Sequence, residues 1–147
     1  MKKLNLWLLL SLFVAAFTLT ACGGSDDDTT DTNPLFGRWE SSLSIGAETS
    51  TSYAFEIRDD NSITYEYRLY SSNGSLHNGY NLTGTYQLVG QTMKVTFTKF
   101  TRVTDDKDSF EQIDQYDYTY KIENNKLYIS GDDTNGQVFK DTEFVKK

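Results

Sequence analysis

The fold of this chain is indicated most clearly by the stretch Tyr86-Gln87-Leu88-Val89-Gly90-Gln91-Thr92-Met93-Lys94-Val95. Apolar and polar residues alternate on both sides of Gly90-Gln91, which is typical of two half-buried strands joined by a two-residue turn. Folding the stretch at that turn places Leu88 opposite Met93, and the other apolar side chains then fall on the same face. The stretch therefore predicts an antiparallel hairpin.

The same pattern continues through residues 35–147, which contain all ten tyrosines. Residues 120–129 repeat the hairpin around Asn124-Asn125. Asn73-Gly74 is the dipeptide of a type I′ turn, and residues 59–61 fit a three-residue loop. These turns, chosen on local chemistry, all give one shared apolar face. The predicted cross-strand pairs are Ile57 with Ile63, Phe55 with Tyr65, Ile63 with Gly84, Tyr65 with Leu82, Tyr67 with Tyr80, Leu88 with Met93, Tyr86 with Val95, Gly84 with Phe97, Ile122 with Leu127, and Tyr120 with Ile129.

Residues 105–108 are predicted to join two further strands through a turn centred on Asp106-Lys107. The pairs expected from that centre are Phe97 with Tyr116 and Val95 with Tyr118 on one face, and Arg102 with Glu111 and Phe100 with Ile113 on the other. Eight strands are predicted in all, at residues 36–45, 51–58, 62–71, 77–89, 92–104, 109–123, 126–130 and 137–145.

Eight antiparallel strands joined in sequence order can close into a barrel, which removes the exposed edges of an open sheet. The sequence therefore predicts an all-β protein with an eight-stranded antiparallel up-and-down β-barrel. Eight of the ten tyrosines fall on its inward face. The residues predicted to face inward are Trp39, Tyr53, Phe55, Ile57, Ile63, Tyr65, Tyr67, Tyr80, Leu82, Tyr86, Leu88, Met93, Val95, Phe97, Tyr116, Tyr118, Tyr120, Ile122, Leu127, Ile129 and Phe144.

An interior rich in tyrosine has two interpretations. A buried phenol whose hydrogen bond is not made costs ~1–3 kcal/mol, and tyrosines around a partly wet cavity avoid that cost. The first interpretation is therefore a cavity for a small hydrophobic or amphipathic ligand. In the second, the rings fill the barrel and their hydroxyls reach backbone or water. The candidate ligand-binding residues are Tyr53, Tyr65, Tyr67, Tyr86, Tyr116, Tyr118, Tyr120, Lys99 and Asp114.

Lys99 and Asp114 are expected to face each other on the inward side, two residues beyond Phe97 and Tyr116. At a barrel mouth, such a pair can hold the polar head group of a ligand. It is equally consistent with an ordinary rim salt bridge, which contributes less than ~1 kcal/mol to stability.

The N-terminus carries a different pattern. Lys2 and Lys3 precede an apolar run over residues 4–19, and the run ends in Leu19-Thr20-Ala21-Cys22, which contains the only cysteine. This stretch resembles the lipobox of bacterial lipoproteins. The resemblance implies that residues 1–21 are a cleaved signal peptide, helical before removal, and that Cys22 carries acyl chains such as palmitate.

Residues 22–34 then form a flexible tether, because Gly, Ser, Asp, Thr and Asn cannot build a core. The acidic run within residues 23–28 resembles the export signal of surface lipoproteins in Bacteroidota-type bacteria. It implies a lipid-anchored protein on the outer face of the outer membrane. A solvated spacer on a periplasm-facing lipoprotein is the alternative.

Residues 35–147 resemble the lipocalin-like domains of bacterial lipoproteins. The likeness rests on Phe36-Gly37-Arg38-Trp39-Glu40, which is similar to the Gly-x-Trp signature of lipocalins. It implies a calycin-type barrel whose closed end is plugged by Trp39 next to Gly37, and a small hydrophobic ligand. The disulfide and the long C-terminal helix of lipocalins have no counterpart in this sequence.

Composition narrows the functional classes. Removing Lys2 and Lys3 with the signal leaves 12 Lys and Arg against 21 Asp and Glu, a net charge of −9 that repels nucleic acid. We find no catalytic motif, no metal-binding pattern and no cofactor motif around the single His77. The sequence thus predicts a monomeric, non-enzymatic envelope lipoprotein that binds a ligand. The alternative is a structural or interaction lipoprotein that contacts a protein or glycan through its loops.

Overall fold

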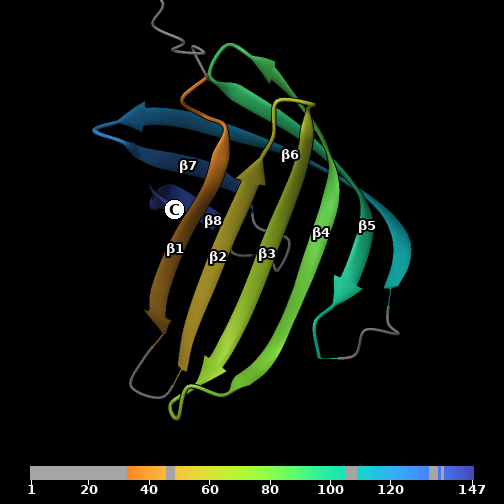
Figure 1. Cartoon of the computed structure of the whole chain (residues 1–147), viewed down its shortest axis with the longest axis vertical. Helices are drawn as coiled ribbons and strands as arrows, with labels where there is room; N and C mark the ends of the chain where they lie inside the picture. Colours follow the sequence, from red (N-terminus) through yellow and green to blue (C-terminus); the bar gives the residue numbers. More distant parts are fainter. Residues whose placement is uncertain (1–32, 46–48, 105–108, 133–135, 137) are drawn as a thin grey trace, which may run out of the picture. The chain divides into compact units, whose positions relative to one another are not determined.

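The computed structural model describes residues 33–45, 49–104, 109–132, 136 and 138–147. They form eight strands, β1 (Gly37–Ile45), β2 (Thr49–Ile57), β3 (Ser62–Ser71), β4 (Leu76–Val89), β5 (Thr92–Arg102), β6 (Ser109–Glu123), β7 (Lys126–Asp132) and β8 (Val138–Lys146). Each strand pairs antiparallel with the next, and β8 returns to β1, so that the sheet closes on itself (Figure 1). The predicted all-β, eight-stranded up-and-down barrel is confirmed. The predicted signal peptide, the predicted lipidation site Cys22 and the predicted tether up to residue 32 lie outside the described residues.

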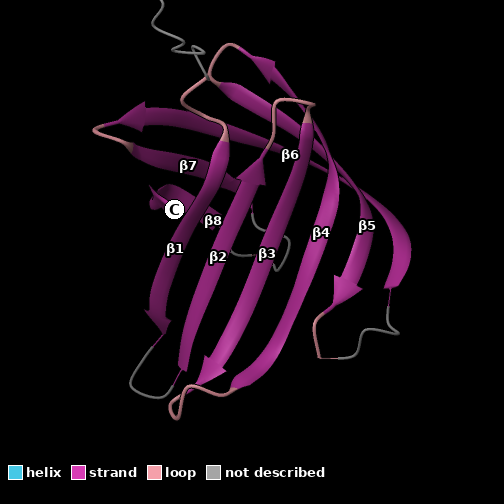
Figure 2. Ribbon diagram, viewed as in Figure 1, coloured by secondary structure: helices cyan, strands magenta, loops and turns pink. Residues whose placement is uncertain are grey.

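The described region consists of strands joined by turns, as Figure 2 shows. All ten cross-strand pairs predicted from the hairpin turns are present. The turns have the backbone that their residues favour, because Asn61, Asn124 and Asn125 take φ values of 64°, 52° and 59°. Asparagine adopts this left-handed region more readily than most residues. Local turn chemistry therefore sets the register of these hairpins.

The register predicted between β5 and β6 is wrong by two residues. Val95 pairs with Tyr116 instead of Tyr118, and Phe97 pairs with Asp114 instead of Tyr116. Because side-chain direction alternates with a period of two, this shift leaves the inward residues inward. The predicted turn at 105–108, which set the wrong centre, lies outside the described residues.

A β-bulge at Thr98 changes the outer end of β5. The register shifts against both β4 and β6 between Phe97 and Lys99. Against β4 the extra residue is Thr98 of β5, whereas against β6 the extra residue stands on β6, between Asp114 and Glu111. An extra residue reverses the alternation of the strand beyond it. The inward position therefore passes to Phe100, and Lys99 turns outward. The pairs found there are Lys99 with Glu111 and Phe100 with Phe110, in place of the predicted Arg102 with Glu111 and Phe100 with Ile113.

The barrel is closed by a short ladder between β1 and β8. In the described residues it consists of two pairs, Trp39 with Lys146 and Glu40 with Val145, whereas the next shortest ladder, between β6 and β7, has five. Beyond these pairs a hollow of about 620 Å³ lies between the two strands. Ser41 of β1 is among the residues that line it. Of all neighbouring strands, β1 and β8 therefore share the shortest ladder of paired residues.

Candidate functional site

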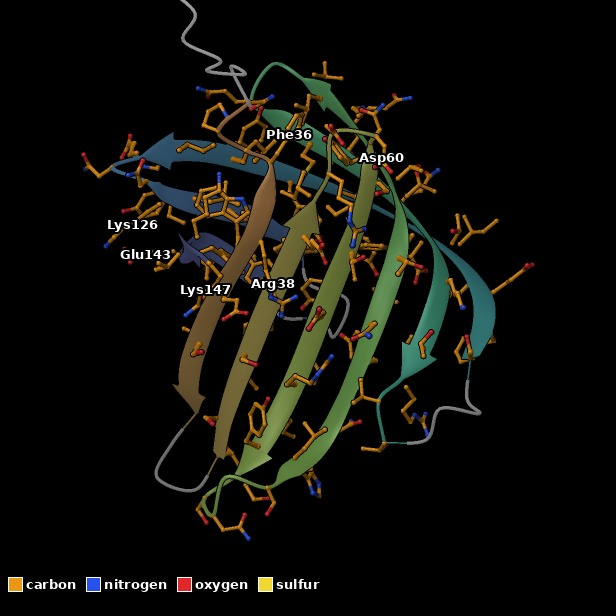
Figure 3. All side chains as sticks on the ribbon, viewed as in Figure 1. Phe36, Arg38, Asp60, Lys126, Glu143 and Lys147 are labelled. Carbon is orange, nitrogen blue, oxygen red and sulfur yellow. The ribbon has the colours of Figure 1, made fainter. Side chains whose placement is uncertain are left out.

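The two ends of the barrel receive different connections. The hairpins β2–β3, β4–β5 and β6–β7 and the entering segment 33–36 gather at one end, which we call the closed end. Figure 3 labels Phe36 and Asp60 there. At the opposite end, which we call the mouth, β1, β3, β5 and β7 end and β2, β4, β6 and β8 begin.

The closed end is plugged by Trp39. Its side chain is 1% exposed, and its Nε1 donates a hydrogen bond to the carbonyl oxygen of Leu35 at 2.8 Å. The Lys146 Nζ lies 5.2 Å from the centre of the indole ring, a cation–π distance. Gly37 has a φ of 125°, and a Cβ there would stand 2.9 Å from the Lys146 Cε. Glycine two residues before the tryptophan thus lets the lysine stem cross over the plug.

Aromatic rings fill the half of the barrel next to this plug, which we call the closed half. Phe55 has no exposed surface. The ring centroids of Tyr65, Phe144 and Tyr118 lie 5.0, 5.4 and 5.6 Å from that of Phe55. Tyr53 belongs to the same cluster and is also buried. In the closed half, the interior is therefore packed with side chains.

The seven tyrosines predicted to line a cavity lie in different environments. Tyr65 and Tyr118 are fully buried in the closed half, and Tyr53, which pairs with Tyr67, is fully buried as well. Tyr86 is also buried, and its hydroxyl donates a hydrogen bond to the carbonyl oxygen of Arg58 at 2.7 Å. Burial, reinforced by nearby carboxylates, raises the pKa of Tyr86. These four tyrosines belong to the packed core.

The other three predicted tyrosines are half-buried. Tyr120 lies near the closed end, where its N–H donates to the carbonyl oxygen of Gln91 at 2.9 Å. Tyr67 and Tyr116 are two residues farther from the closed end than the buried Tyr65 and Tyr118. Of the predicted tyrosines, these two are therefore the ones that reach the part of the interior open to the mouth.

Four stacked rings, which we call the mouth band, cross this open half from strand to strand. Tyr67 of β3, Tyr80 of β4, Phe100 of β5 and Phe110 of β6 follow one another with centroid separations of 5.1, 5.2 and 4.8 Å. Their successive planes meet at 28°, 23° and 21°. Tyr67 and Phe100 are half-buried, and Phe110 is 49% exposed. Tyr80 is buried at 7% exposure, and Phe110 also lines a hollow with outward residues such as Glu111 and Ile113, so the band meets solvent at its Phe110 end.

Lys99 and Asp114 do not form the predicted pair. The bulge at Thr98 turns Lys99 to the outer surface, where its side chain is exposed. Asp114 remains on the inward side of β6, opposite the buried Phe97. Its carboxylate is half-buried and accepts a hydrogen bond from the side-chain amide of Gln112. The structure thus keeps one member of the predicted pair at the mouth.

Sequence reasoning missed two rings of the mouth band, Phe100 and Phe110. The signal that would have found Phe100 is its spacing from Phe97, because two inward aromatic residues three positions apart require an extra residue between them. Phe110 lies four residues from Asp114, so alternation along β6 places it on the inward side. Continuing the strict alternation through Thr98 placed Phe100 outside.

The outer wall carries an ion-pair network that the sequence pattern also did not reveal. The Arg38 Nε lies 2.8 Å from Glu40, and its Nη1 lies 2.6 Å from Glu66, which Arg68 also approaches at 3.3 Å. The hydrogen bond from Arg38 lowers the pKa of Glu66, and the two carboxylates raise that of Arg38. Figure 3 labels Arg38 on the wall, and the network flanks a shallow hollow that includes the small, buried Ala54. These contacts link β1 to β3. The charged side chains of the network are all engaged with one another, so we do not assign a ligand site to this hollow.

Across the described ranges, no three or more His, Cys, Asp or Glu side chains are grouped to hold a metal ion. The same ranges contain no helix with the length and hydropathy needed to cross a membrane. No family model matches the chain, and no curated protein matches it.

Proposed function

We propose that this chain is a cell-envelope lipoprotein whose barrel binds a small hydrophobic or amphipathic ligand in the open half of its aromatic interior. The observation that carries the proposal is the mouth band, in which Tyr67 and Phe100 point inward and remain half-buried. Such rings offer an apolar face, and Tyr67 and Tyr116 add phenol groups for a polar part of the ligand. The packed closed half provides a rigid base below them.

The proposed attachment rests on Leu19-Thr20-Ala21-Cys22. Acyl chains on Cys22 anchor the protein in the outer membrane, and the acidic run that follows directs it to the cell surface. Two or more acyl chains suffice for stable anchoring without a membrane-spanning helix. The barrel then works as a lipocalin-like binding module and performs no catalysis.

Binding is tested by titrating the mature protein with N-phenyl-1-naphthylamine, an uncharged probe whose fluorescence rises in apolar surroundings. We expect saturable binding that Phe100→Ala weakens by about tenfold, the equivalent of ~1.4 kcal/mol. Ile113→Ala is the matched control, because Ile113 points outward from β6 and is 76% exposed. Absence of binding, or a loss with Ile113→Ala but not with Phe100→Ala, would refute the proposed site.

Anchoring is tested by fractionating bacterial cells that express the full chain. Cys22→Ser removes the thiol that is acylated, so the protein should leave the membrane fraction. Thr20→Ser keeps the lipobox pattern and should stay there. Equal membrane recovery of both variants would rule out attachment through Cys22.

A further inference from the structure

Asp114 is a carboxylate placed among aromatic rings. It lies on the inward side of β6, directly opposite Phe97 and two residues from Tyr116. Toward the closed end, the ring centroids of Phe97 and Tyr116 lie 5.9 Å apart. Toward the mouth, the rings of Phe100 and Phe110 stack with their centroids 4.8 Å apart. A ligand that enters through the mouth band therefore meets a half-buried carboxylate on a strand that carries aromatic residues on both sides of it, Tyr116 and Phe110.

Within the described residues, no cationic side chain pairs with Asp114. Lys99 lies outside the barrel because of the bulge at Thr98. Arg102 has an inward position, but it is exposed at the end of β5, roughly 15 Å along the strand from the residue opposite Asp114. The hydrogen bond that Asp114 accepts comes from the neutral amide of Gln112. Among the described side chains, no cation therefore offsets the charge of this carboxylate.

A carboxylate next to aromatic faces is suited to an organic cation. The faces of Tyr and Phe rings attract ammonium groups through their quadrupole, and the attraction grows when the cation is partly desolvated. A carboxylate strengthens that preference and opposes an anionic head group. The net charge of −9 on the mature chain acts in the same direction at long range.

We infer that the ligand of this barrel is an amphipathic organic cation, an amine or a quaternary ammonium compound, whose head group lies against Asp114 and the surrounding rings. This inference rests on the proposed binding function and specifies the class of its ligand. The apolar part of the ligand then lies along the mouth band, on Tyr67 and Phe100.

The test compares three probes with the same ten-carbon chain by isothermal titration calorimetry on the mature protein at low salt, below their micelle concentrations. They are decyltrimethylammonium, decyldimethylphosphine oxide and decyl sulfate, with cationic, neutral and anionic heads. We expect the cation to bind about tenfold more tightly than the neutral probe, a difference of ~1.4 kcal/mol, and the anion to bind most weakly. The preference should shrink as salt is added, because salt screens the carboxylate.

Asp114→Asn should lower the affinity for the cation to that for the neutral probe and leave the neutral probe unaffected. Asp117→Asn is the matched control, since Asp117 lies on the same strand but points outward, 3.9 Å from Lys94. This control should keep the cation preference.

The outcomes separate the two proposals. Neutral binding that equals or exceeds cation binding, or a cation preference that survives Asp114→Asn, overturns the inference and leaves the binding function standing. If none of the three probes binds, the proposed function itself fails, and this inference fails with it.

Discussion

The closed half and the open half of this barrel use the same residue types in different ways. Tyr65 and Tyr67 stand two residues apart on β3 and both point inward, yet Tyr65 has no exposed surface and Tyr67 is half-buried. Tyr118 and Tyr116 on β6 repeat this contrast. Inward direction, which the alternation of a sequence predicts, does not by itself determine burial. Distance from the Trp39 plug does not determine it alone either, because Tyr53 and Tyr80, the cross-strand partners of Tyr67, are both buried.

This contrast separates stability from binding. Rings of the closed half contact one another on several sides, so they supply dispersion and hydrophobic energy to the fold. Rings of the mouth band stack in a row, and two of them, Tyr67 and Tyr80, also contact the rings of Tyr53 and Tyr65. The other two, Phe100 and Phe110, have only the stacking contacts of the row and keep part of their surface in water. The surface still exposed in the folded protein is what a ligand can bury. Three measurements test whether this division is correct.

The largest effect is expected from Phe55→Ala in the closed half. Phe55 is completely buried, and three rings lie within 5.6 Å of its own by centroid. Removing it creates a cavity that its packed neighbours fill only in part, so the free energy of unfolding should fall by about 3–5 kcal/mol. Urea unfolding followed by Trp39 fluorescence measures this. A loss below ~1 kcal/mol would show that the closed half is not the stabilising core.

A smaller effect is expected from Phe110→Ala in the mouth band. Its ring is 49% exposed and stacks on Phe100 alone among the described rings. Loss of that contact should lower the free energy of unfolding by about 1 kcal/mol. The same urea experiment serves. A loss equal to that of Phe55→Ala would erase the distinction between the two halves.

The smallest effect is expected from Glu66→Gln on the outer wall. Arg38 holds the pKa of Glu66 below its ordinary 4.5, so the ionised form is favoured in the folded state. Glu66 is partly exposed and screened by solvent, which limits the loss at pH 7 to about 1 kcal/mol or less. The difference from wild type should persist above pH 4.5 and vanish as the pH falls through the lowered pKa.

The measurement is urea unfolding of both proteins at a series of pH values from 7 downward. Glu143→Gln is the control, because Glu143 pairs with Lys126 at 2.7 Å on an exposed surface. No detectable loss of stability is expected for it at any pH. A difference between wild type and Glu66→Gln that grows toward acid pH would contradict the assigned direction of the shift.

The hairpins show what sequence alone predicts in this fold. Asn73-Gly74 and Asn124-Asn125 have strong local backbone preferences, and the pairs counted outward from them are all present. Residues 105–108 offer no comparable dipeptide, so the β5–β6 register was placed two residues away. Where a turn has a definite geometry, strand register follows from it. Where a turn has no definite geometry, the alternation of apolar and polar residues predicts which side of the sheet a side chain faces. It does not predict which residue of the next strand is its partner.

The candidate site was predicted less completely than the fold. Alternation placed Tyr67, Tyr116 and Asp114 on the inward side correctly. It placed Lys99 inside and Phe100 outside, because a bulge inserts one extra residue into the strand and shifts the alternation beyond it. The residue types around Thr98 give little indication of such an insertion. Alternation also could not predict how deeply each side chain is buried. Tyr65 and Tyr67 both occupy inward positions of the same alternating strand, yet their exposure differs.

The two-pair seam between β1 and β8 has a mechanical consequence. Every other pair of neighbouring strands shares at least five paired positions, so thermal breathing of the wall costs least where Trp39 and Glu40 meet the last strand. Parting there would also loosen the plug, because Trp39 supplies one of the two pairs and Lys146 lies over its ring. The plug and the side wall of the barrel would therefore open together at this seam.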